Sequence, residues 1–191
     1  MASYIAFEGG EGSGKSTQAA RVAERLDALL TREPGATPLG TELRRLLLAN
    51  GDWSVGERAE ALMMAADRAQ HLDEVVAPAL AGGRHVVSDR SAYSSLAYQG
   101  GGRELGIEAV RAINTWAIAE RWPDVVVYLR VDREVARSRL NRSLDRLEQE
   151  GEAFHRRVGA AFDQLAEREP DRWLVIDGHR PPDEVGDEVW Q

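Results

Sequence analysis

The sequence contains no cysteine, which excludes disulfide bonds and thiolate metal sites. Positive charge is outnumbered, because 24 Lys and Arg stand against 32 Asp and Glu and leave a net charge of -8 at pH 7. Binding of a nucleic-acid polymer needs a basic footprint and is disfavoured, whereas local arginines can still hold a small anion. There is no apolar run of membrane-spanning length and no basic, cleavable leader, so we expect a cytoplasmic protein without a membrane partner.

Apolar, strand-like runs alternate with segments of helical apolar spacing along the 191 residues, without a repeat or a domain linker. This alternation predicts right-handed crossovers, and therefore a three-layer α/β fold with helices on both faces of a five-stranded parallel sheet. The expected strands lie near 4–7, 28–31, 85–88, 124–131 and 173–176. The expected helices lie near 15–26, 39–49, 57–80, 95–98 (interrupted by the glycines at 100–102), 108–121, 132–141, 154–166 and 183–190.

Residues 9–16 match the phosphate-loop pattern G-x-x-x-x-G-K-[ST]. The glycines allow positive φ angles and a close approach to the ligand, so successive N–H groups can form an anion nest at a helix N-terminus. Lys15 adds a charge for the β- and γ-phosphates, and Ser16 adds a hydroxyl for Mg²⁺. Because the motif follows a strand and opens a helix, a plain glycine-rich turn is the weaker interpretation. The residues predicted to bind ATP are Gly9, Gly10, Glu11, Gly12, Ser13, Gly14, Lys15, Ser16 and Thr17.

A carboxylate ends the third expected strand, where His85-Val86-Val87-Ser88 is followed by Asp89 and Arg90. Ligands of open parallel sheets bind beyond the carboxyl ends of the strands, so Asp89 is predicted to lie near the phosphate loop and to hold Mg²⁺ directly or through water. The alternative is that Asp89 caps the next helix. Arg90 is suited to contact a phosphate group.

Segments over nearly the whole chain resemble thymidylate kinases. The most specific are Arg32-Glu33-Pro34-Gly35 and the stretch from Ser88-Asp89-Arg90 to Ser94-Ser95-Leu96-Ala97-Tyr98-Gln99-Gly100. The others are Phe7-Glu8-Gly9, Thr37-Pro38-Leu39-Gly40, Leu43-Arg44, Asp67-Arg68-Ala69-Gln70-His71, Pro123-Asp124 and Asp145-Arg146-Leu147-Glu148. The resemblance implies one domain of the P-loop NTPase fold over residues 1–191 with a small lid at about 142–152. It further implies in-line transfer of phosphate from ATP to dTMP with Mg²⁺, and a homodimer.

The resemblance also implies roles for individual residues. Arg44 and Arg90 look like the arginines that hold the acceptor phosphate, and Arg68 resembles the arginine that donates to thymine O4. Tyr98 resembles the aromatic residue that packs under the sugar and leaves no room for a 2′-hydroxyl. The full set implied to bind dTMP is Glu11, Arg44, Met64, Arg68, Arg90, Ser95, Tyr98 and Gln99. The residues implied to lie near the metal are Glu11, Ser16 and Asp89.

The phosphate loop has no arginine at Gly12 or Ser13. This is similar to the bacterial type of the family, in which a lid arginine supplies positive charge over ATP. Arg142 and Arg146 are the candidates here, with a simple surface position as the alternative for each. The predicted catalytic residues are therefore Lys15, Arg90, Arg142 and Arg146.

Two features depart from the family pattern. Met64 stands where phenylalanine usually stacks on thymine. It lies one helical turn before Arg68, so it either faces the base or belongs to the core. The connection from Leu26 to Leu29 is short and lacks the expected glycine, which indicates an early helix end, an abbreviated second strand or residues missing from the sequence.

Two other functions stay open. A P-loop kinase could phosphorylate another monophosphate or a deoxynucleoside, and an alcohol acceptor would want a carboxylate base, for which Glu33 is the only candidate. A non-catalytic nucleotide switch would bind ATP or GTP and a partner protein and would turn over slowly. The chain lacks the N-K-x-D guanine signature, which disfavours a GTPase.

Overall fold

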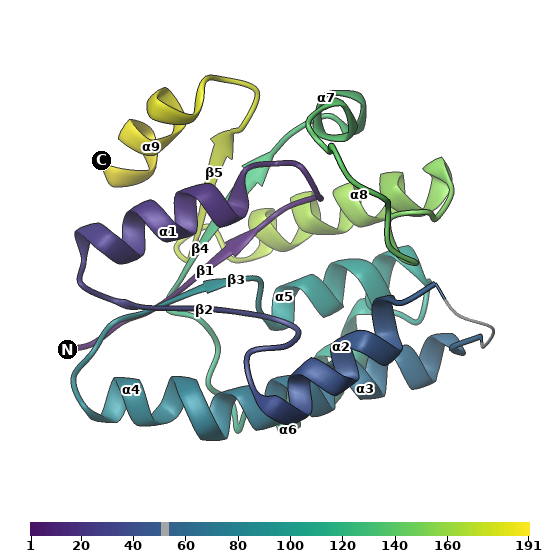
Figure 1. The fold of residues 1–191 in the computed structure, drawn as a ribbon, viewed down its shortest axis with the longest axis horizontal. Coiled ribbons are helices and arrows are strands. Elements are labelled where there is room, and N and C mark those ends of the chain that lie inside the picture. The colour runs from purple at the N-terminus through teal and green to yellow at the C-terminus, as the bar shows by residue number, and fades with distance from the viewer. Residues whose placement is uncertain (51–53) are drawn as a thin grey trace.

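The computed structural model describes residues 1–50 and 54–191. Its centre is a five-stranded sheet of order β2-β3-β1-β4-β5 in which every neighbouring pair is parallel (Figure 1). This confirms the predicted parallel sheet with helices on both faces. The strands are β1 (Tyr4–Glu8), β2 (Leu29–Arg32), β3 (Val86–Asp89), β4 (Val125–Arg130) and β5 (Trp173–Asp177).

Helices fill most of the connections between the strands. Those before β3 are α1 (Lys15–Arg25), α2 (Pro38–Leu48), α3 (Glu57–His71), the π-helical turn η1 (Leu72–Val76) and α4 (Ala77–Ala81). Those between β3 and β4 are α5 (Ala92–Ser95), the π-helical η2 (Leu96–Gly102) and α6 (Ile107–Ala117). The last are α7 (Arg133–Ser138), α8 (Glu152–Arg168) and α9 (Pro182–Trp190). Within the described ranges, no helix combines the length and the apolar character needed to cross a bilayer.

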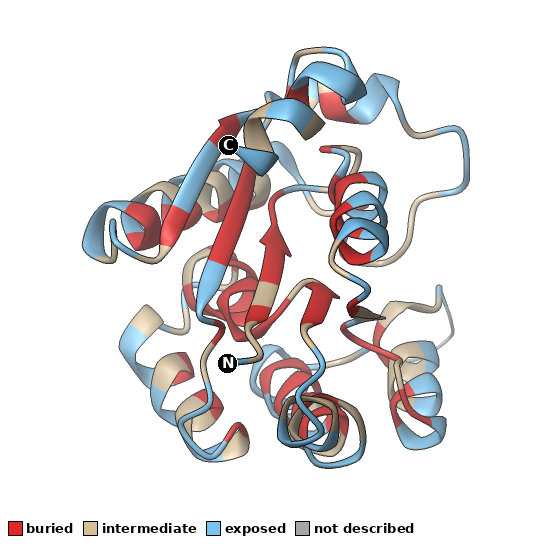
Figure 2. Ribbon diagram, turned by 90° about the vertical axis from the view of Figure 1, so that its left-hand side faces the viewer, coloured by how far each residue is buried: buried red, intermediate tan, exposed pale blue. Residues whose placement is uncertain are grey.

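The pleat of the sheet divides the core into two layers. Phe7, Val127 and Ile176 point to one face and pack with apolar residues of α1 and α9. Val126 and Tyr128 point to the other face, where they join the large cluster formed with η2, α6 and α8. Figure 2 shows the buried strands between these helical layers. The phosphate loop and the end of β3 therefore start from rigid, fully covered strands.

The sequence predicted that the glycines at 100–102 interrupt the helix. In the structure they instead continue it as the π-helical η2. Their role is close packing against α8. A Cβ atom on Gly101 would lie 2.6 Å from the Cβ of Ala161, and one on Gly102 would lie 2.6 Å from the ring of Phe154. The glycines thus allow the backbone of η2 to approach α8. The Tyr98 ring on η2 then packs edge-on against the rings of Phe154 and Phe162.

The short connection between α1 and β2 is closed by a left-handed residue that is not glycine. Asp27 has φ of 50°. The N–H of Ala28 donates to the carbonyl of Ala23 at 2.8 Å, and the N–H of Asp27 donates to the carbonyl of Glu24 at 3.3 Å. This pattern is a Schellman motif, in which Asp27 occupies the position that glycine favours. The helix therefore ends early, and β2 begins at Leu29.

We expect Asp27→Gly to raise the free energy of unfolding by about 0.5 kcal/mol. The left-handed conformation costs about 1–2 kcal/mol for residues with a Cβ atom, although less for Asp, and glycine loses about 0.5–1 kcal/mol through the entropy of the unfolded chain. Alanine has a Cβ atom, unlike glycine, and tolerates the left-handed conformation less well than aspartate. Asp27→Ala should therefore lower the free energy of unfolding by about 1 kcal/mol. Urea unfolding of the three proteins measures the difference, and equal stabilities for both variants would contradict the assignment.

Candidate active site

The phosphate loop joins β1 to α1 and needs its glycines for steric reasons. Gly9, Gly12 and Gly14 have φ of 139°, 78° and 97°, which residues with a Cβ atom rarely adopt. A Cβ atom on Gly12 would also lie 2.1 Å from the carbonyl oxygen of Ala136 in α7. The loop is thus wrapped tightly against α7, and α1 begins at Lys15 with its N–H groups at the loop.

Lys15 is folded over the phosphate loop and donates from Nζ to the carbonyl of Gly10 at 2.7 Å. The residue is buried, and burial together with the charge of Arg90 lowers the pKa of its amine. A buried ammonium group held by one carbonyl is under-compensated, which favours the binding of an anion beside it.

The two candidate metal ligands outside the loop backbone meet at its edge. The register pairs Phe7 of β1 with Asp89 of β3, and Ser16 Oγ donates to Asp89 Oδ2 at 2.5 Å. Asp89 does not cap the next helix, because the capping side chain of α5 is Ser91. No group of three His, Cys, Asp or Glu suited to a metal occurs among the described residues. One hydroxyl and one carboxylate do fit Mg²⁺, which keeps several waters and otherwise binds the phosphates of its nucleotide.

Arg90 follows β3 and carries a strained backbone with φ of 77°. Buried Glu8, at the end of β1, holds the turn after it: its carboxylate accepts hydrogen bonds from the N–H and hydroxyl groups of both Ser91 and Ser94, at 2.6–3.2 Å. Burial raises the pKa of Glu8. Strain of this kind persists only where the surroundings impose it, and it is common at functional sites.

The Arg90 guanidinium lies between the phosphate loop and η2. It donates to the carboxylate of Glu11, to the carbonyl of Gly9 at 3.2 Å and to Ser94 Oγ at 2.9 Å. Its carbon lies 5.1 Å from the centroid of the Tyr98 ring. Lys15 and then Arg90 hold the pKa of Glu11 well below its usual range. The proposed acceptor-phosphate arginine is therefore adjacent to the phosphate loop, as the sequence required.

One pocket is lined by all eight residues predicted to bind the acceptor. Arg68 lies deep in it on α3 and donates four hydrogen bonds: to Glu33 at 2.6 Å, Ser95 Oγ at 3.0 Å, the carbonyl of Ser91 at 3.0 Å and the side chain of Asn114. These four hydrogen bonds use four of the five N–H groups of its guanidinium. The pocket is lined by Glu11, Glu33, Pro34, Arg44, Leu48, Met64, Arg68, Arg90, Ser94, Ser95, Tyr98, Gln99, Arg142, Asp145, Leu147, Glu148 and His155.

The Arg32-Glu33-Pro34-Gly35 segment shapes one wall of this pocket. Burial opposes the charge of Glu33, but Arg68 and His71 outweigh it and lower its pKa. His71 is fully buried, and it bridges Glu33 Oε1 at 2.9 Å and Thr31 Oγ1 at 2.7 Å. Arg44, which also lines the pocket, donates to the carbonyl of Pro34 at 2.8 Å.

Met64 lies at the boundary between the hydrophobic core and the acceptor pocket. It belongs to the large hydrophobic cluster and is 8% exposed, and it also lines the acceptor pocket together with Arg68. A residue at the edge of the core can support a base with one side of its thioether while the other side packs inward.

The structure separates the two lid arginines. Arg142 lines the acceptor pocket and also the pocket around the phosphate loop, and it pairs with Glu148 at 2.5 Å and Glu11 at 3.7 Å. Arg146 points elsewhere, because its guanidinium donates to buried Glu60 at 2.7 Å and to the carbonyl of Leu47 at 2.8 Å. Arg146 lines neither pocket.

Sequence reasoning assigned no role to several residues that build the site. Glu8 was visible only as part of Phe7-Glu8-Gly9, Asn114 only as a polar residue inside an apolar helix, and Glu60 only as one acid among many in 57–80. A polar side chain on the buried face of a helix is the available signal, because burial requires it to have a partner.

Comparison with known proteins is consistent with this geometry. The family model described as Thymidylate kinase matches residues 7–189. A thymidylate kinase of Halothermothrix orenii is 45% identical over 197 residues, covering 98% of this chain and 94% of the relative. One of Synechococcus sp. (strain JA-3-3Ab) is 48% identical over 194 residues, covering 98% and 93%.

A solved structure is similar over the whole fold. The crystal structure of thymidylate kinase from Ehrlichia chaffeensis superposes with a TM-score of 0.81 and 29% identity, covering 99% of this chain and 96% of that one. A family match over nearly the whole chain, together with relatives of this identity, places the sequence. The chain belongs to the thymidylate kinase family.

Proposed function

We propose that this protein transfers the γ-phosphoryl group of ATP to dTMP, acting as one P-loop kinase domain over 1–191 with a lid at about 142–152. The observation that carries the proposal is the junction of two pockets. Glu11 and Arg142 line both the pocket around the phosphate loop and the acceptor pocket. A triphosphate seated on the loop and a monophosphate held by Arg90 and Arg44 would meet there end to end.

The chemical difficulty of this reaction is charge repulsion. A phosphomonoester is largely dianionic at pH 7, so the acceptor oxygen needs no general base. One like-charge pair at about 4 Å costs roughly 4 kcal/mol at an effective dielectric of 20, and the two ligands would bring several such pairs together. Lys15, Arg44, Arg90 and Arg142 supply the compensating charge and stabilise the in-line transition state.

Mg²⁺ belongs to the same proposal. Ser16 and Asp89 would hold it, with Glu11 near the sugar and the metal, and the ion would neutralise charge on the β- and γ-phosphates. The Ser16–Asp89 distance of 2.5 Å supports a shared ligand at this edge of the loop.

An alcohol acceptor is the weaker alternative because its candidate base is occupied. Glu33 is fully buried and binds Arg68 at 2.6 Å and His71 at 2.9 Å, which together lower its pKa. A carboxylate stabilised in this way is a weak proton acceptor. The pocket therefore favours a monophosphate over a deoxynucleoside.

A coupled ADP-release assay with a panel of acceptors tests the function. We expect rapid ADP release with dTMP, slower release with dUMP and little with dCMP, dGMP or thymidine. The missing methyl group of dUMP is worth only about 1–3 kcal/mol, so partial activity follows. Slow turnover that no monophosphate accelerates would instead support a nucleotide switch.

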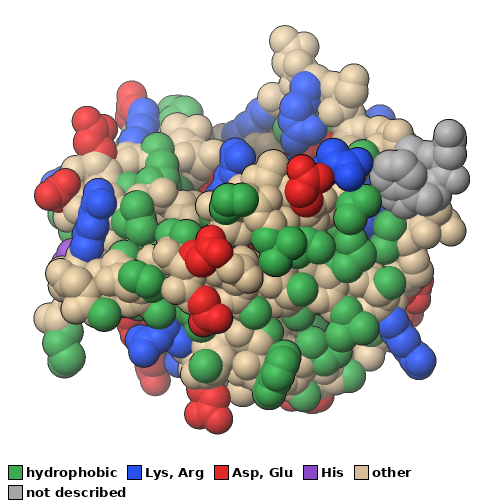
Figure 3. Space-filling view, turned by 60° about the horizontal axis from the view of Figure 1, so that its bottom comes forward, with side chains coloured by type: hydrophobic (Ala, Val, Ile, Leu, Met, Phe, Trp, Pro, Cys, Tyr) green, Lys and Arg blue, Asp and Glu red, His purple; other side chains and the backbone are tan. Residues whose placement is uncertain are grey.

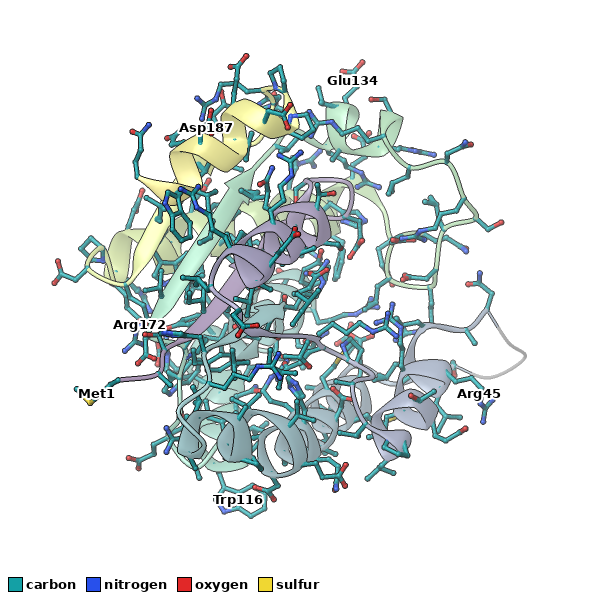
Figure 4. The ribbon with its side chains drawn as sticks, turned by 60° about the vertical axis from the view of Figure 1, so that its left-hand side comes forward. Met1, Arg45, Trp116, Glu134, Arg172 and Asp187 are labelled. Carbon is teal, nitrogen blue, oxygen red and sulfur yellow. The ribbon has the colours of Figure 1, made fainter. Side chains whose placement is uncertain are left out.

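We further propose a homodimer that works in the cytoplasm. Figure 3 shows hydrophobic side chains gathered over the lower helices of Figure 1, and Figure 4 shows Trp116 of α6 pointing away from the body. Leu62 of α3 and Trp116 are 57% and 85% exposed. A second copy covering this face would bury apolar surface that is costly in water.

A further inference from the structure

A buried carboxylate on α3 lies directly behind the acceptor pocket. Glu60 is 0% exposed. It accepts hydrogen bonds from Gln99 Nε2 at 2.9 Å, from Arg103 at 3.1 Å and from Arg146 at 2.7 Å. The carboxylate thus joins η2, which carries Gln99 and is followed by Arg103, to the lid segment that carries Arg146.

The Glu60 carboxylate decides which way the Gln99 amide faces. An ionised carboxylate only accepts hydrogen bonds, so the amide must present its NH₂ group to Glu60. The amide oxygen then diverges from Glu60, and Gln99 lines the acceptor pocket. The amide oxygen is therefore the Gln99 group that remains available as an acceptor for a ligand in this pocket. The two arginines hold Glu60 in place from its other sides, so the carboxylate cannot turn away.

A donor lies in the same pocket on Arg68, which keeps one N–H group after its four hydrogen bonds to the protein. A donor and an acceptor in one pocket match the edge of thymine or uracil, which carries a carbonyl at C4 and an N–H at N3. Cytosine carries an amino group and a bare nitrogen at these positions, so both contacts would be mismatched.

We propose that Glu60 is a positioning residue for base specificity, which fixes the Gln99 amide so that the pocket selects bases with an N3–H group. This inference rests on the proposed function. The negative charge of the Glu60 carboxylate is what fixes the Gln99 amide. A carboxamide at position 60 could face Gln99 with either its oxygen or its nitrogen, and the Gln99 amide would then be free to reverse.

Glu60→Gln is the test, with Glu57→Gln as the matched control because Glu57 is exposed on the same helix. We expect Glu60→Gln to lower the ratio of kcat/KM for dTMP over dCMP by about tenfold or more, mainly through KM for dTMP. The ratio for dTMP over dUMP should stay unchanged, because these bases share the N3 and C4 groups. A merely structural role would lower all three activities together, and that outcome would overturn the inference.

Two further measurements keep the test independent of folding. In a Gln99→Leu background, Glu60→Gln should cause no additional loss of dTMP-over-dCMP discrimination, even where it lowers Tm. With the unmodified protein, N3-methyl-dTMP should be a poor acceptor, and turnover equal to that of dTMP would overturn the inference. Failure of the unmodified protein to phosphorylate dTMP at all would instead overturn the proposed function.

Discussion

Arg90→Ala is expected to lower kcat by about 10³-fold or more while the affinity for ATP changes by less than about threefold. The loss corresponds to roughly 4 kcal/mol of transition-state stabilisation, which is at the lower end of what an arginine contributes when it offsets charge in phosphoryl transfer. Arg90 lines the acceptor pocket and is absent from the pocket around the phosphate loop, so ATP keeps its contacts.

The geometry explains why no neighbour replaces Arg90. Its guanidinium binds Glu11, Gly9 and Ser94 at once, and Glu8 holds the following turn through four hydrogen bonds. A shorter side chain leaves the acidic residues at this edge with less compensation, and the pKa of Glu11 should rise because Arg90 is one of the charges that lower it.

Steady-state kinetics and ATP titration of Arg90→Ala measure the effect, with Arg84→Ala as the control because Arg84 is exposed just before the same strand. The control should keep wild-type kcat. Equal losses of turnover and of ATP affinity in Arg90→Ala would count against a role at the acceptor, and thermal unfolding would show whether the turn itself has failed.

The phosphate loop and the sheet were predictable because their signals are local. Residues 9–16 carry a motif whose glycines are demanded by contacts as close as 2.1 Å, and Val86, Val126 and Ile176 lie in short β-branched runs that are buried as expected. The position of Asp89 followed from a general rule of parallel sheets, that side chains after neighbouring strands meet at one edge.

Partnerships at long range were not predictable. The short connection after α1 concealed a left-handed aspartate, and the glycines at 100–102 indicated a break where the helix continues. The sequence could not show that Arg68 donates four hydrogen bonds to other residues of the protein. Nor could it show that Arg146 binds Glu60, which lies 86 residues earlier in the chain. Such choices depend on which side chains the fold brings together, and spacing along the chain does not encode them.

The two lid arginines should therefore behave differently. We expect Arg142→Ala to lower kcat by about 10²-fold or more with little change in stability. Its side chain is 50% exposed, so its ion pairs with Glu148 and Glu11 contribute little to folding, roughly 0–1 kcal/mol. Its place at the junction of the two pockets lets it offset charge as the phosphoryl group is transferred.

Arg146→Ala should do the reverse. Its side chain is only 20% exposed and donates to a Glu60 carboxylate that is completely buried, so truncation leaves that charge short of one donor. The expected cost is about 1–3 kcal/mol of unfolding free energy, with kcat reduced less than tenfold. Urea unfolding and steady-state kinetics on both variants separate the roles. A steep loss of kcat in Arg146→Ala with unchanged stability would mean that the lid turns this arginine toward the phosphates during turnover, and that Arg142 is not the charge that acts there.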